Sequence, residues 1–209
     1  MPSKLNAYSL CAVMLAALLQ CASGAPFENS PTDSPAGDPS GDDGEIEAST
    51  DQLRNNLQRA IDITKALQTE FKDEFQGQVD YESLKSYQVS SLPEGNPRCN
   101  FNKEPCLHRL VRGLLTYTAL LKYVEKEYPG STIPSLATRS SCLITEIAKK
   151  MRAPGQVIAL TSSQDEQQLS HFDSLDSFHR KMTAHAILYH FHYFLVDISR
   201  LIEKAEKPR

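Results

Sequence analysis

The 209-residue sequence predicts an all-α protein, a four-helix bundle with up-up-down-down topology. Four segments of roughly 20 or more residues repeat apolar side chains every three or four positions, as an amphipathic helix does. We find no convincing strand, and the short apolar run at 157–160 is expected to tuck against the bundle. The predicted links are about 28, 6 and 16 residues long, and the two long ones can cross the length of a bundle, at about 3.3 Å per residue.

The first predicted helix begins at Ser49, where Ser49 and Gln52 form a capping-box pattern that satisfies free backbone amides. Gly77 is expected to end it. Its apolar face contains Leu53, Leu57, Ile61, Thr64, Leu67, Phe71 and Phe75.

The second helix is predicted from Pro105 to Tyr128, the third from Pro134 to about Met151, and the fourth from about Ser170 to Glu206. The short link at Pro129-Gly130 makes the second and third helices antiparallel neighbours. The inward stripe of the second helix is Leu110, Leu114, Tyr117, Leu121 and Val124. That of the third is Leu136, Ser140, Leu143, Ile147 and Met151. That of the fourth is Ala184, Leu188, Phe191, Leu195, Ile198 and Ile202.

Two segments precede this domain, which spans residues 49–209. Residues 1–24 are typical of a secretory signal peptide, with Lys4, an apolar run over 10–19 and small residues before a cut at Ala25. Residues 25–48 contain seven acids, four prolines and no base, and are expected to be disordered. The domain itself keeps 21 bases and 19 acids and is near neutral.

Several classes of function are disfavoured. The net charge of −4 argues against nucleic-acid binding, and no apolar stretch reaches the roughly 18 residues of a membrane span. His185, His190 and His192 lack the i, i+4 spacing of a helical metal site, so neither a metal nor a cofactor is expected. No motif recommends catalysis.

Three cysteines remain after residue 24. Cys99 and Cys106 can close a small ring that anchors the first long link on the second helix, and we predict this disulfide. Metal binding is the weaker alternative, since no matching His or Cys pair follows. Cys142 lies roughly opposite the third stripe and is expected to be partly exposed and unpaired.

The fourth helix carries a second set of residues opposite its core stripe, which we expect to face solvent as a binding face. Tyrosine and arginine, which dominate interface hot spots, are both present in it. The alternative is that the aromatics are scattered surface residues. The set is Met182, Tyr189, Tyr193, Val196 and Arg200.

Two blocks resemble the interleukin-6 family of long-chain helical cytokines. Residues 99–121 (CNFNKEPCLHRLVRGLLTYTALL) contain two cysteines around an Asn-Phe loop, followed by Gly113-Leu114, Tyr117 and Leu121. Residues 182–195 (MTAHAILYHFHYFL) are similar to the family's fourth helix, with Arg200 near its end. The spacing of Cys99 and Cys106 is three residues shorter than is usual, and the earlier disulfide of the mammalian proteins is absent.

The resemblance implies a secreted cytokine that binds the interleukin-6 receptor α chain and recruits two copies of glycoprotein 130, for immune and acute-phase signalling. It places the α-receptor site at one end of the bundle, at Phe101 and Arg200, although Phe101 could instead plug the bundle end. Phe178 takes the position of an aromatic used against the signalling chain, while Glu203 stands where a second base is common.

A secreted carrier of an apolar ligand is the alternative from another class. It would need an internal cavity, whereas the stripes offer large Leu, Ile and Phe side chains.

Overall fold

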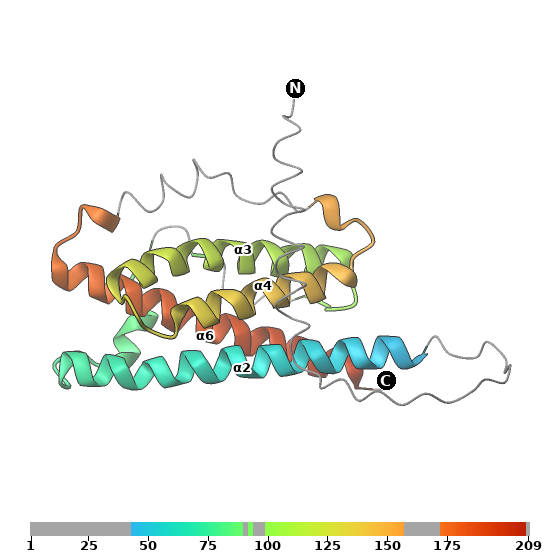
Figure 1. Cartoon of the computed structure of the whole chain (residues 1–209), viewed down its shortest axis with the longest axis horizontal. Coiled ribbons are helices and arrows are strands. Elements are labelled where there is room, and N and C mark those ends of the chain that lie inside the picture. Colours follow the sequence, from blue (N-terminus) through green and yellow to red (C-terminus); the bar gives the residue numbers. More distant parts are fainter. Residues whose placement is uncertain (1–42, 90–91, 94–98, 157–171, 208–209) are drawn as a thin grey trace, which may run out of the picture.

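The computed structural model describes residues 43–89, 92–93, 99–156 and 172–207 (Figure 1). Within them the chain forms helices and no strand, which confirms the predicted all-α class. The apolar run at 157–160 lies outside the described residues. The long helices are α2 (Asp43–Phe75), α3 (Glu104–Glu127), α4 (Ile133–Lys149) and α6 (Ser177–Glu206), with short 3-10 helices η1 (Tyr81–Lys85) and η2 (Pro154–Gln156).

The four long helices form a bundle in which α2 and α3 run one way and α4 and α6 run the other (Figure 1). Helices α4 and α6 each pack against both α2 and α3. Neighbouring helices are therefore antiparallel, and the up-up-down-down topology is confirmed. Residues 128–132 make the short turn, and residues 76–103 and 150–176 make the two long links, the second longer than predicted.

Helix α2 begins at Asp43, six residues before the predicted start. Ser49 is inside the helix and cannot be its N-cap, so the predicted capping box is wrong. The preceding residues include Glu45, Glu47 and Ala48, all good helix formers, which explains why the helix extends into the acidic segment. The helix ends at Phe75, and the left-handed conformation of Gly77 (φ 73°) turns the chain there.

Helix α6 begins later than predicted, at Ser177 rather than near Ser170. Asp176 is its N-cap, and the Asp176 carboxylate accepts a hydrogen bond from the backbone N–H of His179 at 3.0 Å. This side-chain bond satisfies an amide that has no partner within the helix, which fixes the start. The short helical turn at Phe172 and Asp173 is separate.

The apolar residues of the predicted stripes of α2, α3, α4 and α6 meet in one hydrophobic core, except Phe71 and Phe75 of α2. Tyr117 stacks on Phe191 with ring centroids 4.7 Å apart. Gly113 lies directly against Phe194, because a Cβ there would come within 2.4 Å of the ring. Aromatic and large aliphatic side chains fill this interior, so the structure gives the carrier hypothesis no support.

A second cluster covers the outer side of α6 and corrects the predicted binding face. Met182 and Tyr189 were expected to face solvent, yet they are only 5% and 4% exposed. They pack with Leu84 of η1 and with Phe71 and Phe75 of α2. The link between α2 and α3 lies over this side of α6, which helical periodicity alone could not reveal.

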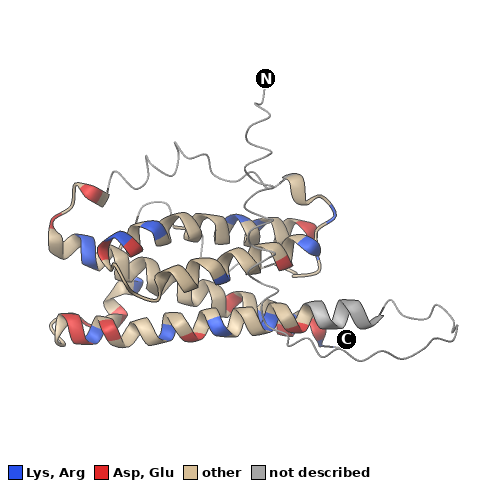
Figure 2. Cartoon of the chain, viewed as in Figure 1, with Lys and Arg blue, Asp and Glu red and all other residues tan. Residues whose placement is uncertain are grey.

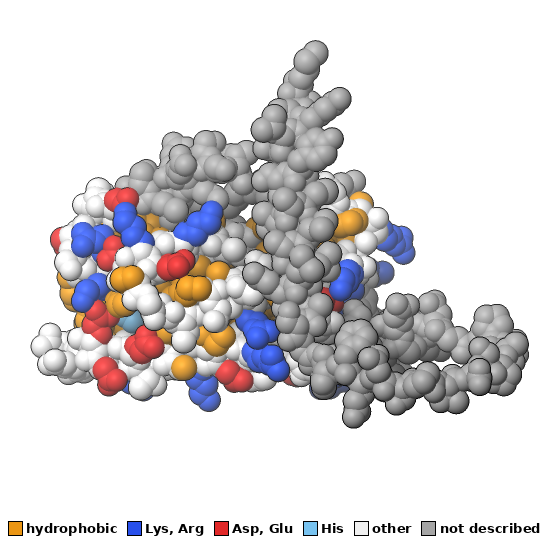
Figure 3. Space-filling view, viewed as in Figure 1, with side chains coloured by type: hydrophobic (Ala, Val, Ile, Leu, Met, Phe, Trp, Pro, Cys, Tyr) orange, Lys and Arg blue, Asp and Glu red, His pale blue; other side chains and the backbone are white. Residues whose placement is uncertain are grey.

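Lysines and arginines are interspersed with acids along the helices rather than forming one block (Figure 2). On the face seen in Figure 3, the described side chains of both signs are interspersed with apolar groups. In the described part of the chain, no helix is both long and apolar enough to cross a membrane.

Candidate functional site

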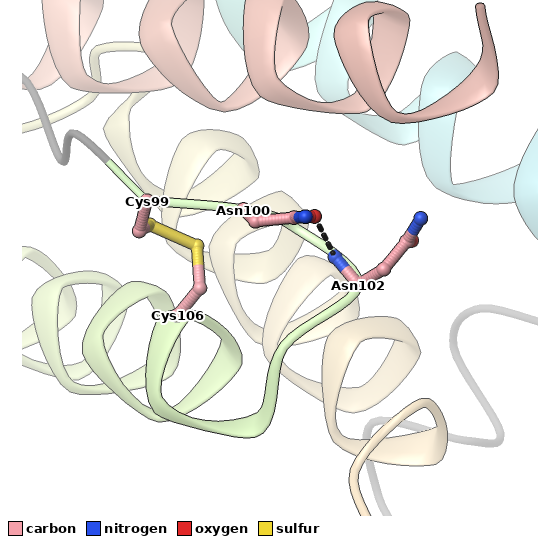
Figure 4. Close-up of a disulfide and its surroundings, with 4 residues drawn as sticks. All are labelled: Cys99, Asn100, Asn102 and Cys106. Atoms are coloured by element: carbon pink, nitrogen blue, oxygen red, sulfur yellow. Dashed lines mark hydrogen bonds between the residues drawn. A yellow bond between two sulfur atoms is a disulfide. The ribbon is translucent and has the colours of Figure 1, made fainter. Parts of the chain in front are cut away.

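The segment before α3 forms a small covalent ring at one end of the bundle. The predicted disulfide joins Cys99 and Cys106, with their Cα atoms 5.5 Å apart (Figure 4). Within the ring, Asn100 Oδ1 accepts a hydrogen bond from the backbone N–H of Asn102 at 3.0 Å. The Asn100 carbonyl accepts another from Lys103 N–H at 2.9 Å. These bonds turn the chain tightly into the first turn of α3.

The ring is also tied to the end of α4. Both carboxylate oxygens of Glu104 accept backbone hydrogen bonds, from Arg152 N–H at 3.0 Å and from Ala153 N–H at 3.1 Å. These two bonds hold the pKa of the Glu104 carboxyl below its usual value. The start of α3 and the chain leaving α4 are therefore fixed relative to each other.

Phe101 is buried rather than presented to solvent. It lies in the ring sequence, yet only 6% of it is exposed, and it belongs to the main hydrophobic core. Of the two interpretations of this residue, the structure supports the bundle plug. A partner could contact the surrounding ring, but little of the Phe101 side chain itself.

Arg200 is exposed near the last turns of α6. The end of α6 and the start of α3, where the ring is attached, lie at the same end of the bundle (Figure 1). Its side chain is 69% exposed and pairs with Asp197 at 3.1 Å. Because Arg200 is open to solvent, its guanidinium can approach an acidic group of a partner. Glu203, one turn further, accepts a hydrogen bond from Ser199 at 3.3 Å.

A groove of about 410 Å³ lies between the first half of α2 and the end of α6. An ion pair between Arg54 and Glu206 joins the two helices there. The sequence does not reveal this groove, because its sides come from helices distant in sequence. Its lining includes Arg54, Asn55, Gln58, Ser199, Ile202 and Glu203.

The other two aromatic candidates differ in exposure. Tyr193 is 42% exposed on α6, and its ring lies 4.8 Å from the ring of buried Tyr189. Tyr189 in turn packs under Tyr81 of η1, with centroids 5.1 Å apart. Tyr189 is therefore a support beneath Tyr193 and not a surface contact, and Val196 is partly buried.

Phe178 lies at the opposite end of α6 from Arg200, in its first turn. It is 50% exposed, and its inner side meets Phe75 edge-on with ring centroids 5.8 Å apart. Its exposure agrees with the predicted contact position. The structure thus places Phe178 and Arg200 on two separate parts of the surface.

Cys142 differs from its prediction in exposure, since it is buried with only 1% of it exposed. Burial on α4 extends beyond the predicted stripe, through the continuous run 142–147. The expected exposed thiol on this helix is therefore wrong.

The three histidines of α6 considered in the sequence pack against other parts of the protein. His185 is buried, and His190 and His192 are partly buried. His192 Nδ1 lies 2.9 Å from the Thr64 hydroxyl of α2. Burial lowers the pKa of both His190 and His192. Among the described residues, no group of three or more His, Cys, Asp or Glu side chains could hold a metal ion.

Comparisons with known proteins identify close relatives. A family model described as the Interleukin-6/G-CSF/MGF family matches residues 35–203. Interleukin-6 of Sparus aurata is 50% identical over 100% of this chain and 92% of the relative. Interleukin-6 of Takifugu rubripes is 49% identical over 97% of this chain and 89% of the relative. Interleukin-6 of the seal Phoca vitulina is 25% identical over 67% of this chain and 70% of the relative.

Proposed function

The chain belongs to the Interleukin-6/G-CSF/MGF family and is a cytokine, and we propose that it is secreted and acts by binding two kinds of receptor chain. The first is the interleukin-6 receptor α chain, and the second is the shared signalling chain glycoprotein 130. Their assembly would start immune and acute-phase signalling. Residues 1–24 would direct secretion and be removed. We assign the chain no catalytic role.

The observation that carries this proposal is the separation of exposed contact residues along α6. Phe178 is 50% exposed, and the side chain of Arg200 is 69% exposed. At 1.5 Å rise per residue they stand about 33 Å apart along the helix axis. A standard interface covers about 800 Å² per partner, a patch roughly 30 Å across. Two receptor chains can therefore bind at the two ends without competing for the same surface.

The α-receptor site is proposed at the end of α6 that lies near the disulfide ring. Arg200 would pair with an acidic receptor side chain, and Tyr193 lies on the same side of the helix, seven residues earlier. Exposed tyrosine and arginine are typical of interface hot spots. Phe101 would contribute indirectly, by holding the ring in place.

The signalling-chain site is proposed at Phe178. Its outer side is free to enter an apolar pocket, while Phe75 supports its inner side. A half-exposed ring of this kind is already fixed in position, so binding would cost little further ordering of the side chain.

Receptor-binding measurements with purified ectodomains test both sites. We expect Arg200→Ala to weaken α-receptor binding at least about tenfold, as a hot-spot residue does. Arg112→Ala, at an exposed arginine on α3, is the matched control and should bind like the parent. Phe178→Ala should keep α-receptor binding and reduce receptor signalling in responsive cells. Equal α-receptor binding by Arg200→Ala and the parent would place the site elsewhere.

A further inference from the structure

A partly buried polar cluster joins three helices beneath Phe178. His185 of α6 is 4% exposed, and its Nε2 lies 2.8 Å from Glu74 Oε2 of α2. The same carboxylate oxygen accepts a hydrogen bond from the Tyr128 hydroxyl, at the end of α3, at 2.5 Å. Lys181 Nζ pairs with Glu74 Oε1 at 2.5 Å. We call Glu74, Tyr128, Lys181 and His185 the Glu74 cluster.

Aromatic rings connect the Glu74 cluster to the surface. The imidazole of His185 meets Phe71 with centroids 4.8 Å apart and Phe75 with centroids 5.8 Å apart. Phe75 is the ring against which Phe178 rests. A change at His185 can therefore reach Phe178 through a single intervening side chain.

The charges in the cluster balance only while His185 is neutral. Nε2 faces a carboxylate oxygen, so this nitrogen carries the hydrogen of the neutral ring and donates it to Glu74. Glu74 and Lys181 then form one ion pair. A second proton, taken from solvent at Nδ1, would add a buried positive charge that the single carboxylate, already paired with Lys181, cannot fully compensate.

The environment of His185 opposes that second proton. Burial lowers the pKa of His185, Glu74 acts in the opposite direction, and the charge of Lys181 lowers the pKa further. From η1, Tyr81 faces Phe71 rather than the imidazole. For Glu74, burial opposes ionisation, but hydrogen bonds from Lys181, Tyr128 and His185 outweigh it and hold its pKa below the usual value.

We propose that the Glu74 cluster is an acid-sensitive clamp, which holds α2, the end of α3 and α6 together at neutral pH and releases Phe178 from Phe75 when His185 is protonated. The inference concerns the free protein and does not depend on the proposed receptors. On mild acidification, the end of the bundle that carries Phe178 becomes less ordered.

The direction of the effect follows from linkage. Because the folded pKa of His185 is below its ordinary value of 6.5, the opened state binds more protons as the pH falls. The stabilisation from neutral His185 is complete above pH 6.5, and it is lost as the pH falls from there through the folded pKa of His185. Glu74, with an ordinary pKa of 4.5, contributes a loss only at lower pH. The pKa values of His190 and His192 are lowered too, and neither ring contacts Phe75 or Phe178 among the contacts described. His179 does meet Phe178 edge-on, with ring centroids 5.5 Å apart, so only the His185→Gln comparison assigns the change to the cluster.

The sequence contains no tryptophan, so one introduced at position 178 can report the release without background from others. In the full secreted chain, Phe178→Trp should show acrylamide quenching that rises about twofold between pH 7.5 and 5.0, as a half-exposed ring becomes free. Adding His185→Gln, which keeps a donor to Glu74 but cannot titrate in this range, should abolish the rise above pH 5.5. Adding His192→Gln, the matched control, should leave it unchanged.

Either of two results would overturn the clamp: no pH-dependent change in the Phe178→Trp reporter, or the same change in the presence of His185→Gln. If His185→Gln does not fold, NMR titration of the His185 ring in the otherwise unchanged chain decides the question. We expect a midpoint below 6.5 that moves still lower in Glu74→Gln. A midpoint at or above 6.5 would contradict the proposal.

Discussion

Phe101→Ala separates a structural role for this side chain from direct receptor contact. Phe101 is 6% exposed and packs in the main core, at the end of the bundle where the disulfide ring enters α3. Truncating a buried phenylalanine to alanine typically costs about 3–5 kcal/mol. The ring lies at a bundle end, where the chain can partly close the gap, so we expect the lower value, about 3 kcal/mol.

The corresponding change in melting temperature is large enough to measure simply. For a domain of this size each kcal/mol moves the melting temperature by about 2–4 °C, so Phe101→Ala should melt about 6–12 °C below the parent. Circular dichroism at 222 nm follows this transition directly. Arg200→Ala removes an exposed side chain and should change stability by less than about 0.5 kcal/mol.

The matched control is Phe101→Leu, which keeps most of the apolar volume and should cost only about 1 kcal/mol. We also expect Phe101→Leu to retain most of the α-receptor binding. A Phe101→Ala protein that melts within about 2 °C of the parent would refute the assignment of Phe101 to the core. The side chain would then be free to face a receptor.

Three further predictions test the packing. Replacing Cys99 and Cys106 by serine should lower the free energy of unfolding by about 2.5 kcal/mol, because the unfolded chain is no longer constrained by the ring. Denaturant unfolding measures this loss, and a loss below about 1 kcal/mol would contradict the prediction. Gly113→Ala should destabilise by about 1–3 kcal/mol through its clash with the facing aromatic ring, whereas Gly155→Ala, with nothing within 4 Å, should be neutral in thermal melts. Leu84→Ala, at a fully buried residue of η1, should cost about 3 kcal/mol, and parent-like unfolding would show that η1 does not cover α6.

Periodicity predicted the helices wherever one side of a helix faces the core and the other faces water. The stripe of α3 is an example, since Leu110, Leu114 and Val124 are all buried as expected. The same pattern does not predict where a 3-10 helix as short as Tyr81–Lys85 lies. Asp80 and Glu82 offered a weak signal, because Asp80 caps this turn.

The errors on α6 have one physical origin. An outward residue is exposed only if no other segment lies over it, and the sequence does not say where the long links run. Met182 and Tyr189 were therefore misplaced, while Tyr193 and Arg200 were predicted correctly as exposed. Phe101 was carried over from a family resemblance, which does not determine how deeply the ring is buried in this chain.

The two halves of α6 should consequently respond differently to mutation. Every residue from 182 to 189 is buried, enclosed by α2, α3 and η1, so substitutions there alter packing before they alter recognition. In the second half only one side is covered, and Tyr193 and Arg200 remain exposed. Because the first half is enclosed, Phe178 is the main apolar surface that it can offer to a partner. Recognition by α6 is thus confined to its first turn and its second half, and the buried stretch between them holds the two surfaces at a fixed separation.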